Sequence, residues 1–316
     1  MTIDEVSLTE ELEGGLRPLE LSADRRARWA TTARALVALT KPRIIELLLI
    51  TTVPTMILAR RGVPGLGLIV LTVVGGALSA GGANALNMVY DRDIDAQMRR
   101  TASRPLVTGA LSPWTAGAFA GALEAASFLV LWQEVNLLAA CITLGAAAFY
   151  VGVYTAVLKR RTPHNIVIGG AAGAAPVLVA WAAVTGGVSP VAWGLFGVIF
   201  LWTPPHFWAL AVRFREDYAT AEVPMLPVVR NLGRVADQIL GYTIALAALT
   251  VALTPVGNLG PIYLAGSAAL GLGFIWKAWV LRRDPTPRRA LAFFHWSISY
   301  LTAYFVLIGV TAVLPR

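Results

Sequence analysis

The sequence predicts an all-α, polytopic membrane protein, a bundle of nine transmembrane helices around a central cavity. Three observations favour this fold class. Hydrophobic residues make up 57% of the 316 residues, and charged residues only 14%. The mean hydropathy is +0.66. The apolar residues also gather in stretches of about 20, the length that crosses a bilayer. Soluble domains carry about 25% charged residues, so the composition excludes a soluble enzyme and a disordered chain.

The elements are predicted in order from the polar N-terminal segment onward. Residues 1–35 hold no apolar core of the kind found in a signal peptide, and we expect a cytosolic tail there. Residues 36–316 form the predicted transmembrane domain. Its spans are expected at 41–59, 66–86, 113–132, 137–157, 165–185, 191–212, 236–256, 260–280 and 292–314. The first is the most polar, because Lys41, Arg43 and Glu46 lie at its start.

The segments between the spans alternate in charge. Lys and Arg are concentrated in 88–110, 158–164, 213–235 and 281–290, whereas 133–136, 186–190 and 257–259 contain none. The positive-inside rule therefore predicts a multi-pass protein of the cell (inner or plasma) membrane, with a cytoplasmic N-terminus and an external C-terminus. Arg60 and Arg61 depart from this alternation. The basic loops account for the net charge of +8. We therefore expect the lipid bilayer as a partner and no binding of nucleic acid.

Small residues are dense at 75–86 and 169–176. No strand precedes the second run, which argues against a nucleotide-binding glycine fingerprint. Small residues four apart instead let membrane helices approach closely, so both runs predict packing faces.

The second span continues into a polar stretch, NMVYDRDIDAQMRRTASRPL. Asn87, Asp91 and Asp95 lie four residues apart, which places them on one stripe of a helix, while Asp93 lies on the other side. Carboxylate and amide oxygens suit Mg²⁺, which commonly bridges one or two carboxylates to substrate phosphates. The spacing therefore predicts metal ligands and catalytic residues, against the alternative of a merely solvated helix end.

Arginines follow this stripe closely. Arg99, Arg100 and Arg104 are predicted to grip the oxygens of a diphosphate, since a guanidinium makes bidentate contacts. A second charged group, which includes Arg213 and Asp217, ends the sixth span on the same side of the membrane. It is expected to face the first group across a shared cavity.

These motifs resemble those of the intramembrane prenyltransferases of the UbiA superfamily, whose first motif is NxxxDxxxD. The resemblance covers roughly residues 36–310. LTKPRIIELLLIT, DRDIDAQMRRTASRPL, LKRRTPHNIVIGGAAGAAP and LWTPPHFWALA through DYATAEVPMLPVV together resemble a branch of the family that farnesylates heme. One departure concerns a second Asp pair, usually spaced DxxxD. Phe214 and Tyr218 occupy those positions here, with Glu216 and Asp217 between them.

The resemblance implies a Mg²⁺-dependent enzyme. It would join farnesyl diphosphate to the 2-vinyl group of heme B and release diphosphate toward the cytoplasm. It also implies Asp217 as a further metal or diphosphate ligand, and Lys41, Arg43 and Lys159 as phosphate contacts. Lys159, Arg160 and Arg161 are alternatively membrane anchors or partners of the heme propionates. A heme A synthase or a terminal oxidase assembly is the implied downstream partner.

His206 lies in TPPHFW and is the best candidate for contacting heme, although a histidine there is as readily a hydrogen-bonded structural residue. Two other functions remain open from the sequence. One is a related prenyltransferase that acts on an aromatic or quinone precursor. The other is a secondary transporter, which should carry its ionisable residues near the bilayer midplane. Most acids here cluster instead at the cytoplasmic ends of the spans, with Glu124 an exception.

Overall fold

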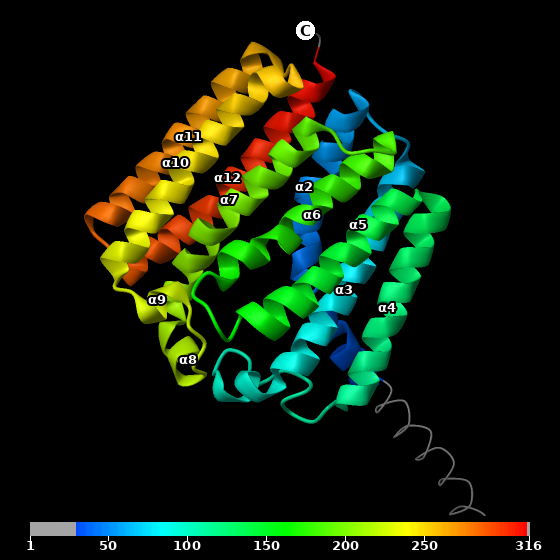
Figure 1. Ribbon diagram of the computed structural model, residues 1–316, viewed down its shortest axis with the longest axis vertical. Helices are drawn as coiled ribbons and strands as arrows, with labels where there is room; N and C mark the ends of the chain where they lie inside the picture. The colour runs from blue at the N-terminus through cyan, green and yellow to red at the C-terminus, as the bar shows by residue number, and fades with distance from the viewer. Residues whose placement is uncertain (1–29, 315–316) are drawn as a thin grey trace, which may run out of the picture.

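The protein is an all-helical bundle (Figure 1). The computed structural model describes residues 30–314, apart from the side chains of residues 43–49. Most of the predicted tail, residues 1–29, lies outside the described residues. Residues 30–40 are helical, and no strand occurs between residues 30 and 314. The predicted fold class is confirmed.

The long helices follow one another up and down the bundle, with two short helices, α8 and α9, between α7 and α10. In chain order they are α2 (Arg43–Arg60), α3 (Leu66–Gln97), α4 (Pro113–Glu134), α5 (Leu137–Ala148), the π-helix η1 (Phe149–Leu158), α6 (Asn165–Thr185), α7 (Pro190–Arg213), α8 (Arg215–Thr220), α9 (Leu226–Val229), α10 (Leu232–Gly257), α11 (Gly260–Arg283) and α12 (Pro287–Val313). η1 continues α5 without a break, so the two form one membrane-length helix.

Eight helices of the described chain are long and apolar enough to cross a membrane, one fewer than predicted. The difference concerns α2, which has 18 residues and includes Arg43, Glu46 and Arg60. It is nevertheless part of the bundle, where it packs against α3, α6 and α12. The charges that made the first span the most polar in the sequence thus explain the lower count.

Polar caps define where several helices begin. Ser112, Asn136 and Ser189 each accept a hydrogen bond from the backbone N–H three residues later, at 3.1, 2.8 and 3.3 Å. Such side chains satisfy amide groups that the first helical turn leaves unpaired. Proline follows directly after Ser112 and Ser189, where its missing N–H costs no helical hydrogen bond.

The glycine-rich runs are packing faces, as predicted. In α3, a Cβ at Gly75 would overlap Leu131 of α4, and Ser127 of α4 donates a hydrogen bond of 2.7 Å to the carbonyl of Gly75. In α6, a Cβ at Gly169 would overlap the ring of Tyr154 in η1. These contacts bring η1 and α4 close to their neighbours, as small residues do in membrane bundles.

The basic connections lie at one end of the bundle. The segment 98–112, the turn at 159–164, and α8 with α9 gather at the lower end in Figure 1. Arg61, which departs from the predicted alternation of basic connections, lies at the other end. Its guanidinium donates a hydrogen bond to the carbonyl of Gly257. Gly257 is the last residue of α10, so the arginine there caps unpaired helix carbonyls. Its position therefore has a local structural cause.

Candidate active site

The predicted stripe lies on the lower part of α3 and points into the bundle. Asn87, Asp91 and Asp95 are 3%, 0% and 2% exposed. Asp93 lies on the outer side of the helix, with its side chain 57% exposed. The separation that the i, i+4, i+8 spacing predicts is therefore present. Buried carboxylates require compensating partners, because an isolated charge is costly away from water.

Those partners are cations from three other segments. Lys159, which follows η1, forms an ion pair with Asp91, and Arg104 forms one with Asp95. Lys41, which precedes α2, donates hydrogen bonds of 3.2 Å to Asn84 and 3.3 Å to Asn87. The fold thus brings Lys41, Arg104 and Lys159 to the acidic stripe.

Lys41 is held in an unusual state. Its φ is 50°, in the left-handed region that residues with side chains seldom adopt. Burial, together with the positive charges of Arg104 and Lys159, lowers the pKa of Lys41 to about 7. A bound anion would oppose this shift, since a nearby opposite charge favours the protonated amine. The three cations thus converge on the acidic stripe, and two of them form ion pairs with its carboxylates.

The second charged group meets the first through Arg100. The backbone N–H of Arg100 donates to the carboxylate of Asp217 at 3.2 Å, and its guanidinium donates to the hydroxyl of Tyr218 at 3.4 Å. The same guanidinium lies 5.2 Å from the ring centroid of Phe214. Phe214 and Tyr218, which replace the usual Asp pair, thus contact an arginine. Burial raises the pKa of the Tyr218 phenol, so the hydroxyl stays protonated.

Not every predicted residue joins this cluster. Within residues 30–314, no three Asp, Glu, His or Cys side chains are grouped closely enough to hold a metal ion, so Asp91, Asp95 and Asp217 do not together form one metal site. Arg213 and Arg99 are exposed. The guanidinium of Arg213 lies 5.9 Å from the Phe214 ring centroid. The side chain of Arg43 lies outside the described residues.

Two contacts were not predicted from the sequence. Arg160 forms a fork of two hydrogen bonds with Asp93, of 2.6 and 2.7 Å, and lies 3.7 Å from Asp91. Thr155 of η1 accepts a hydrogen bond of 3.1 Å from Asn87. Thr155 lies in an apolar stretch with no pattern to single it out. The basic run at 159–161 marked Arg160 as a candidate residue. The sequence did not indicate that Asp93 on α3 would be its partner.

The stripe also fits a divalent cation in its donor chemistry. One carboxylate oxygen of Asp91, Oδ1, is buried and receives no hydrogen bond from the described residues. Oxygen donors from two carboxylates and a carboxamide are those that Mg²⁺ takes when substrate phosphates and water complete its shell. Asn87, Asp91 and Asp95 are therefore the residues that would hold the ion.

His206 lies in α7, away from these charged groups. Its Nδ1 is 2.7 Å from the hydroxyl of Ser297 in α12. Its ring stacks on Trp202 and Phe294, with centroid distances of 4.1 and 4.6 Å. A flat porphyrin therefore finds neither ring face uncovered, and a heme contact would be limited to the Nε2 edge.

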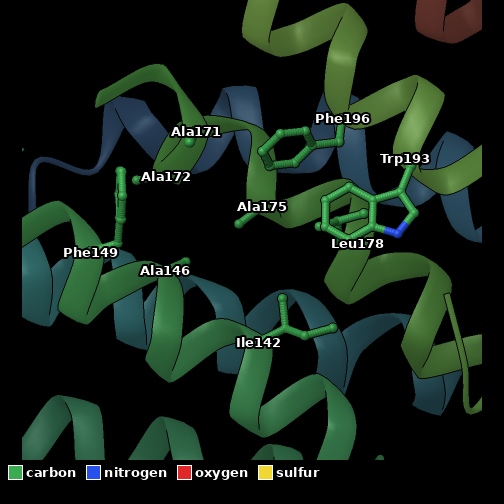
Figure 2. A pocket seen from close by; sticks show the side chains of 9 residues that line it. All are labelled: Ile142, Ala146, Phe149, Ala171, Ala172, Ala175, Leu178, Trp193 and Phe196. Carbon is green, nitrogen blue, oxygen red and sulfur yellow. The ribbon is translucent and has the colours of Figure 1, made fainter. Parts of the chain in front are cut away.

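An apolar cavity of about 190 Å³ lies between the α5–η1 helix, α6 and α7 (Figure 2). Its walls carry no charged side chain and are formed by Ile142, Ala146, Phe149, Ala171, Ala172, Ala175, Leu178, Trp193 and Phe196. Ligand pockets for whole small molecules usually hold about 300–1,000 Å³. The cavity is therefore large enough for part of a hydrocarbon chain and too small for a porphyrin.

The helical bundle and its buried acidic stripe are features of a known protein family. Residues 48–298 match the model of the UbiA prenyltransferase family, and the chain belongs to this family. The protoheme IX farnesyltransferase of Frankia casuarinae is 53% identical over 287 residues, which cover 89% of this chain and 98% of that protein. That of Streptomyces coelicolor is 51% identical over 283 residues, or 88% and 90% of the two chains. The resemblance inferred from the motifs is confirmed.

Solved structures share the fold. A digeranylgeranylglyceryl phosphate synthase superposes with a TM-score of 0.73 at 17% identity, over 89% of this chain and 99% of that one. A UbiA homologue from Archaeoglobus fulgidus bound to GPP and Mg²⁺ has a TM-score of 0.58 at 18% identity, over 87% and 99%. At such identities the likeness concerns the fold.

Proposed function

We propose that this protein transfers the farnesyl group of farnesyl diphosphate to the 2-vinyl group of heme B. Water adds in the same reaction, and the products are heme O and diphosphate. The similarity to protoheme IX farnesyltransferases along most of the chain is the observation that carries the proposal. The buried acids with converging cations supply a site for the diphosphate, the charged end of the first substrate.

The diphosphate would bind at the lower end of α3. In the proposal, Asn87, Asp91 and Asp95 hold Mg²⁺. Asp217, which does not group with them, would be a metal ligand on the side of Arg100, across the diphosphate. A bound Mg²⁺ would neutralise charge on the leaving group. Arginine and lysine supply the remaining contacts with phosphate oxygens. These side chains are Lys41, Arg43, Arg99, Arg100, Arg104, Lys159 and Arg213.

The carbon chemistry would take place in apolar surroundings. The C1–O bond of farnesyl diphosphate breaks, and the bonding electrons leave with diphosphate. The terminal vinyl carbon of heme B then bonds to C1, which leaves a cation beside the porphyrin. Water adds to that cation and loses a proton, giving a hydroxyethylfarnesyl side chain. The protein would orient the two substrates and exclude water until the carbon–carbon bond has formed.

Product analysis tests this function. Cells that express the chain should accumulate a heme whose mass exceeds that of heme B by one farnesyl group and one hydroxyl group. The purified protein should release diphosphate only when both farnesyl diphosphate and heme B are present. Turnover of an aromatic acid or a quinone precursor, with no modified heme, would contradict the proposal. A heme A synthase or a terminal oxidase assembly would use the product.

The charged site is proposed to face the cytoplasm, with the N-terminus on that side and the C-terminus outside. Single cysteines at Ser103 and Ala219, two exposed positions, introduced after Cys141→Ala, test this orientation with a membrane-impermeant thiol reagent. Both lie in basic connections, which the positive-inside rule retains in the cytoplasm. We expect labelling only after the membrane is opened. Labelling of either position from the outer face of intact cells would reverse the orientation.

His206 separates a heme contact from a structural role. We expect His206→Ala to lower stability by about 2–3 kcal/mol, since it removes a hydrogen bond and a ring contact between α7 and α12 and a further ring contact with Trp202 within α7. Both substrates should then be affected alike. Ser297→Ala is the matched control, because it removes the same hydrogen bond from the other partner. Loss of heme binding in His206→Ala alone, with farnesyl diphosphate affinity retained, would instead establish the predicted heme contact at Nε2.

A further inference from the structure

The helix that carries Thr155 changes its winding as it approaches the acidic stripe. α5 becomes the π-helix η1 at Phe149, and the change lasts until Leu158. The N–H of Lys159 bonds to the carbonyl of Tyr154 five residues earlier, at 2.9 Å. A π-helix holds more residues in each turn than an α-helix, and such stretches are frequent at functional sites. Side chains beyond Phe149 therefore point in directions that a continuous α-helix would not give them.

Packing against α6 accommodates this winding. The ring of Tyr154 lies against Gly169, where any Cβ would overlap it. Tyr154 also stacks on Tyr150, with the ring centroids 5.4 Å apart. Gly152, between the two tyrosines, has open space where a side chain would project. The π-helix is thus placed by large side chains that rest on a glycine of the next helix.

The consequence is a matched pair of contacts with α3. Thr155 and Lys159 are four residues apart, as are Asn87 and Asp91. Thr155 meets Asn87 at 3.1 Å, and Lys159 meets Asp91 in an ion pair. All four residues are buried, with Thr155 at 0% exposure. The two pairs thus face each other where η1 packs on α3.

The hydroxyl of Thr155 is one of three partners that fix which way the Asn87 carboxamide faces. A threonine hydroxyl has one hydrogen, and Thr155 donates it to the carbonyl of Tyr150 at 3.0 Å. Toward Asn87 it can therefore only accept, so Asn87 must present its NH₂ group. That group also donates to Asp91 at 2.7 Å. The carbonyl oxygen of Asn87 is then turned toward Lys41, at 3.3 Å.

We propose that Thr155 is a positioning residue of the diphosphate site. It directs the Asn87 Oδ1 toward the metal ion, while Lys159 at the end of the same π-helix pairs with Asp91. Without the hydroxyl, the NH₂ group of Asn87 keeps Asp91 as an acceptor and loses the second one, so the carboxamide is held less firmly with its oxygen toward the ion. This inference rests on the proposed role of Asn87 as a metal ligand.

Substitutions that alter only the hydroxyl test the proposal. Thr155→Val keeps the shape and removes the acceptor, and Thr155→Ser restores it. We expect Thr155→Val to raise the Mg²⁺ concentration for half-maximal activity about tenfold, the lower end of the effect usual for residues that orient metal ligands. Thr155→Ser should stay within about twofold of the parent protein. Turnover at saturating Mg²⁺ should change much less than the Mg²⁺ requirement.

Thr143→Val is the matched control. Thr143 is buried in the α-helical part of the same span, and its hydroxyl donates to the carbonyl of Ala139, four residues earlier, at 2.8 Å. We expect no change in the Mg²⁺ requirement. A second measurement, independent of turnover, is the Mg²⁺-dependent rise in melting temperature with the unreactive analogue farnesyl thiodiphosphate. Thr155→Val should need about tenfold more Mg²⁺ for the same rise.

A double substitution distinguishes failure of this inference from failure of the proposed function. Adding Thr155→Val to Asn87→Ala should cause no further loss, because Thr155 acts through Asn87. Additive losses would overturn the positioning role, as would a parent-like Mg²⁺ requirement in Thr155→Val or an equal effect of Thr143→Val. Full activity and normal Mg²⁺ dependence in Asn87→Ala alone would instead refute the role of Asn87 as a metal ligand. Only a parent protein that forms no heme O would refute the proposed function.

Discussion

Replacing Asp91 with asparagine is expected to lower farnesyl transfer about a thousandfold. The substitution keeps the size of the side chain and removes one negative charge from the proposed metal site. A Lewis-acidic ion supplies several kcal/mol of transition-state stabilisation, and a loss of about 4 kcal/mol corresponds to this factor. Asp95→Asn should have a similar effect. Heme O formation in membranes with equal amounts of protein is the measurement.

Asp93→Asn is the matched control for these variants. It makes the same chemical change on the same helix, but Asp93 lies on the outer face and pairs with Arg160. We expect it to retain most activity. Near-parent activity in both Asp91→Asn and Asp95→Asn would refute the metal-site assignment.

Asp91→Asn also leaves the buried amine of Lys159 without its carboxylate, and breaking a buried ion pair typically costs about 3–5 kcal/mol. Lost activity could therefore reflect a poorly folded protein. Asp91→Asn combined with Lys159→Met removes both charges and should recover the melting temperature. Activity should remain low in the double variant. Recovery of activity together with stability would mean that Asp91 acts only in folding.

Removal of divalent cations is expected to lower turnover as strongly as Asp91→Asn does. EDTA treatment of the detergent-purified protein should lower farnesyl transfer at least a thousandfold, because the diphosphate would leave without charge neutralisation. Added Mg²⁺ should restore it. Ca²⁺ should restore less, since it takes more ligands at longer distances than Mg²⁺.

The control is EDTA already saturated with Ca²⁺ in the presence of excess Mg²⁺, which should leave activity unchanged. Undiminished activity after exhaustive chelation would show that lysine and arginine alone support loss of diphosphate. The heme substrate carries its own iron, so loss of porphyrin iron must be excluded by the absorption spectrum.

Local spacing predicted the acidic stripe correctly because one α-helix carries all of it. Asn87, Asp91 and Asp95 share a face through helix geometry alone, and α3 continues past the apolar run to Gln97. The same reasoning separated Asp93 from the stripe. Contacts between α3 and other segments were less accessible, since they depend on how the helices pack.

Thr155 and Arg160 illustrate that limit. The sequence offers no periodic signal for a π-helix, nor for the close contact of Tyr154 in that element with Gly169 of another helix. The convergence of Asp217 with the arginines after α3 was expected from their common side of the membrane. Its attachment to the backbone N–H of Arg100, apart from Asp91 and Asp95, was not.

The neighbouring residues Lys159 and Arg160 hold opposite sides of one helix. Lys159 reaches the inward carboxylate of Asp91, while Arg160 grips the outward carboxylate of Asp93. The end of α3 is therefore clamped against rotation about its axis, since turning either way would stretch one of the two ion pairs. The two ion pairs differ in exposure, so they should differ in their response to salt. Solvent ions screen the outer Arg160–Asp93 pair far more than the buried Lys159–Asp91 pair. High ionic strength would therefore weaken the Arg160–Asp93 ion pair first and leave the Lys159–Asp91 ion pair intact.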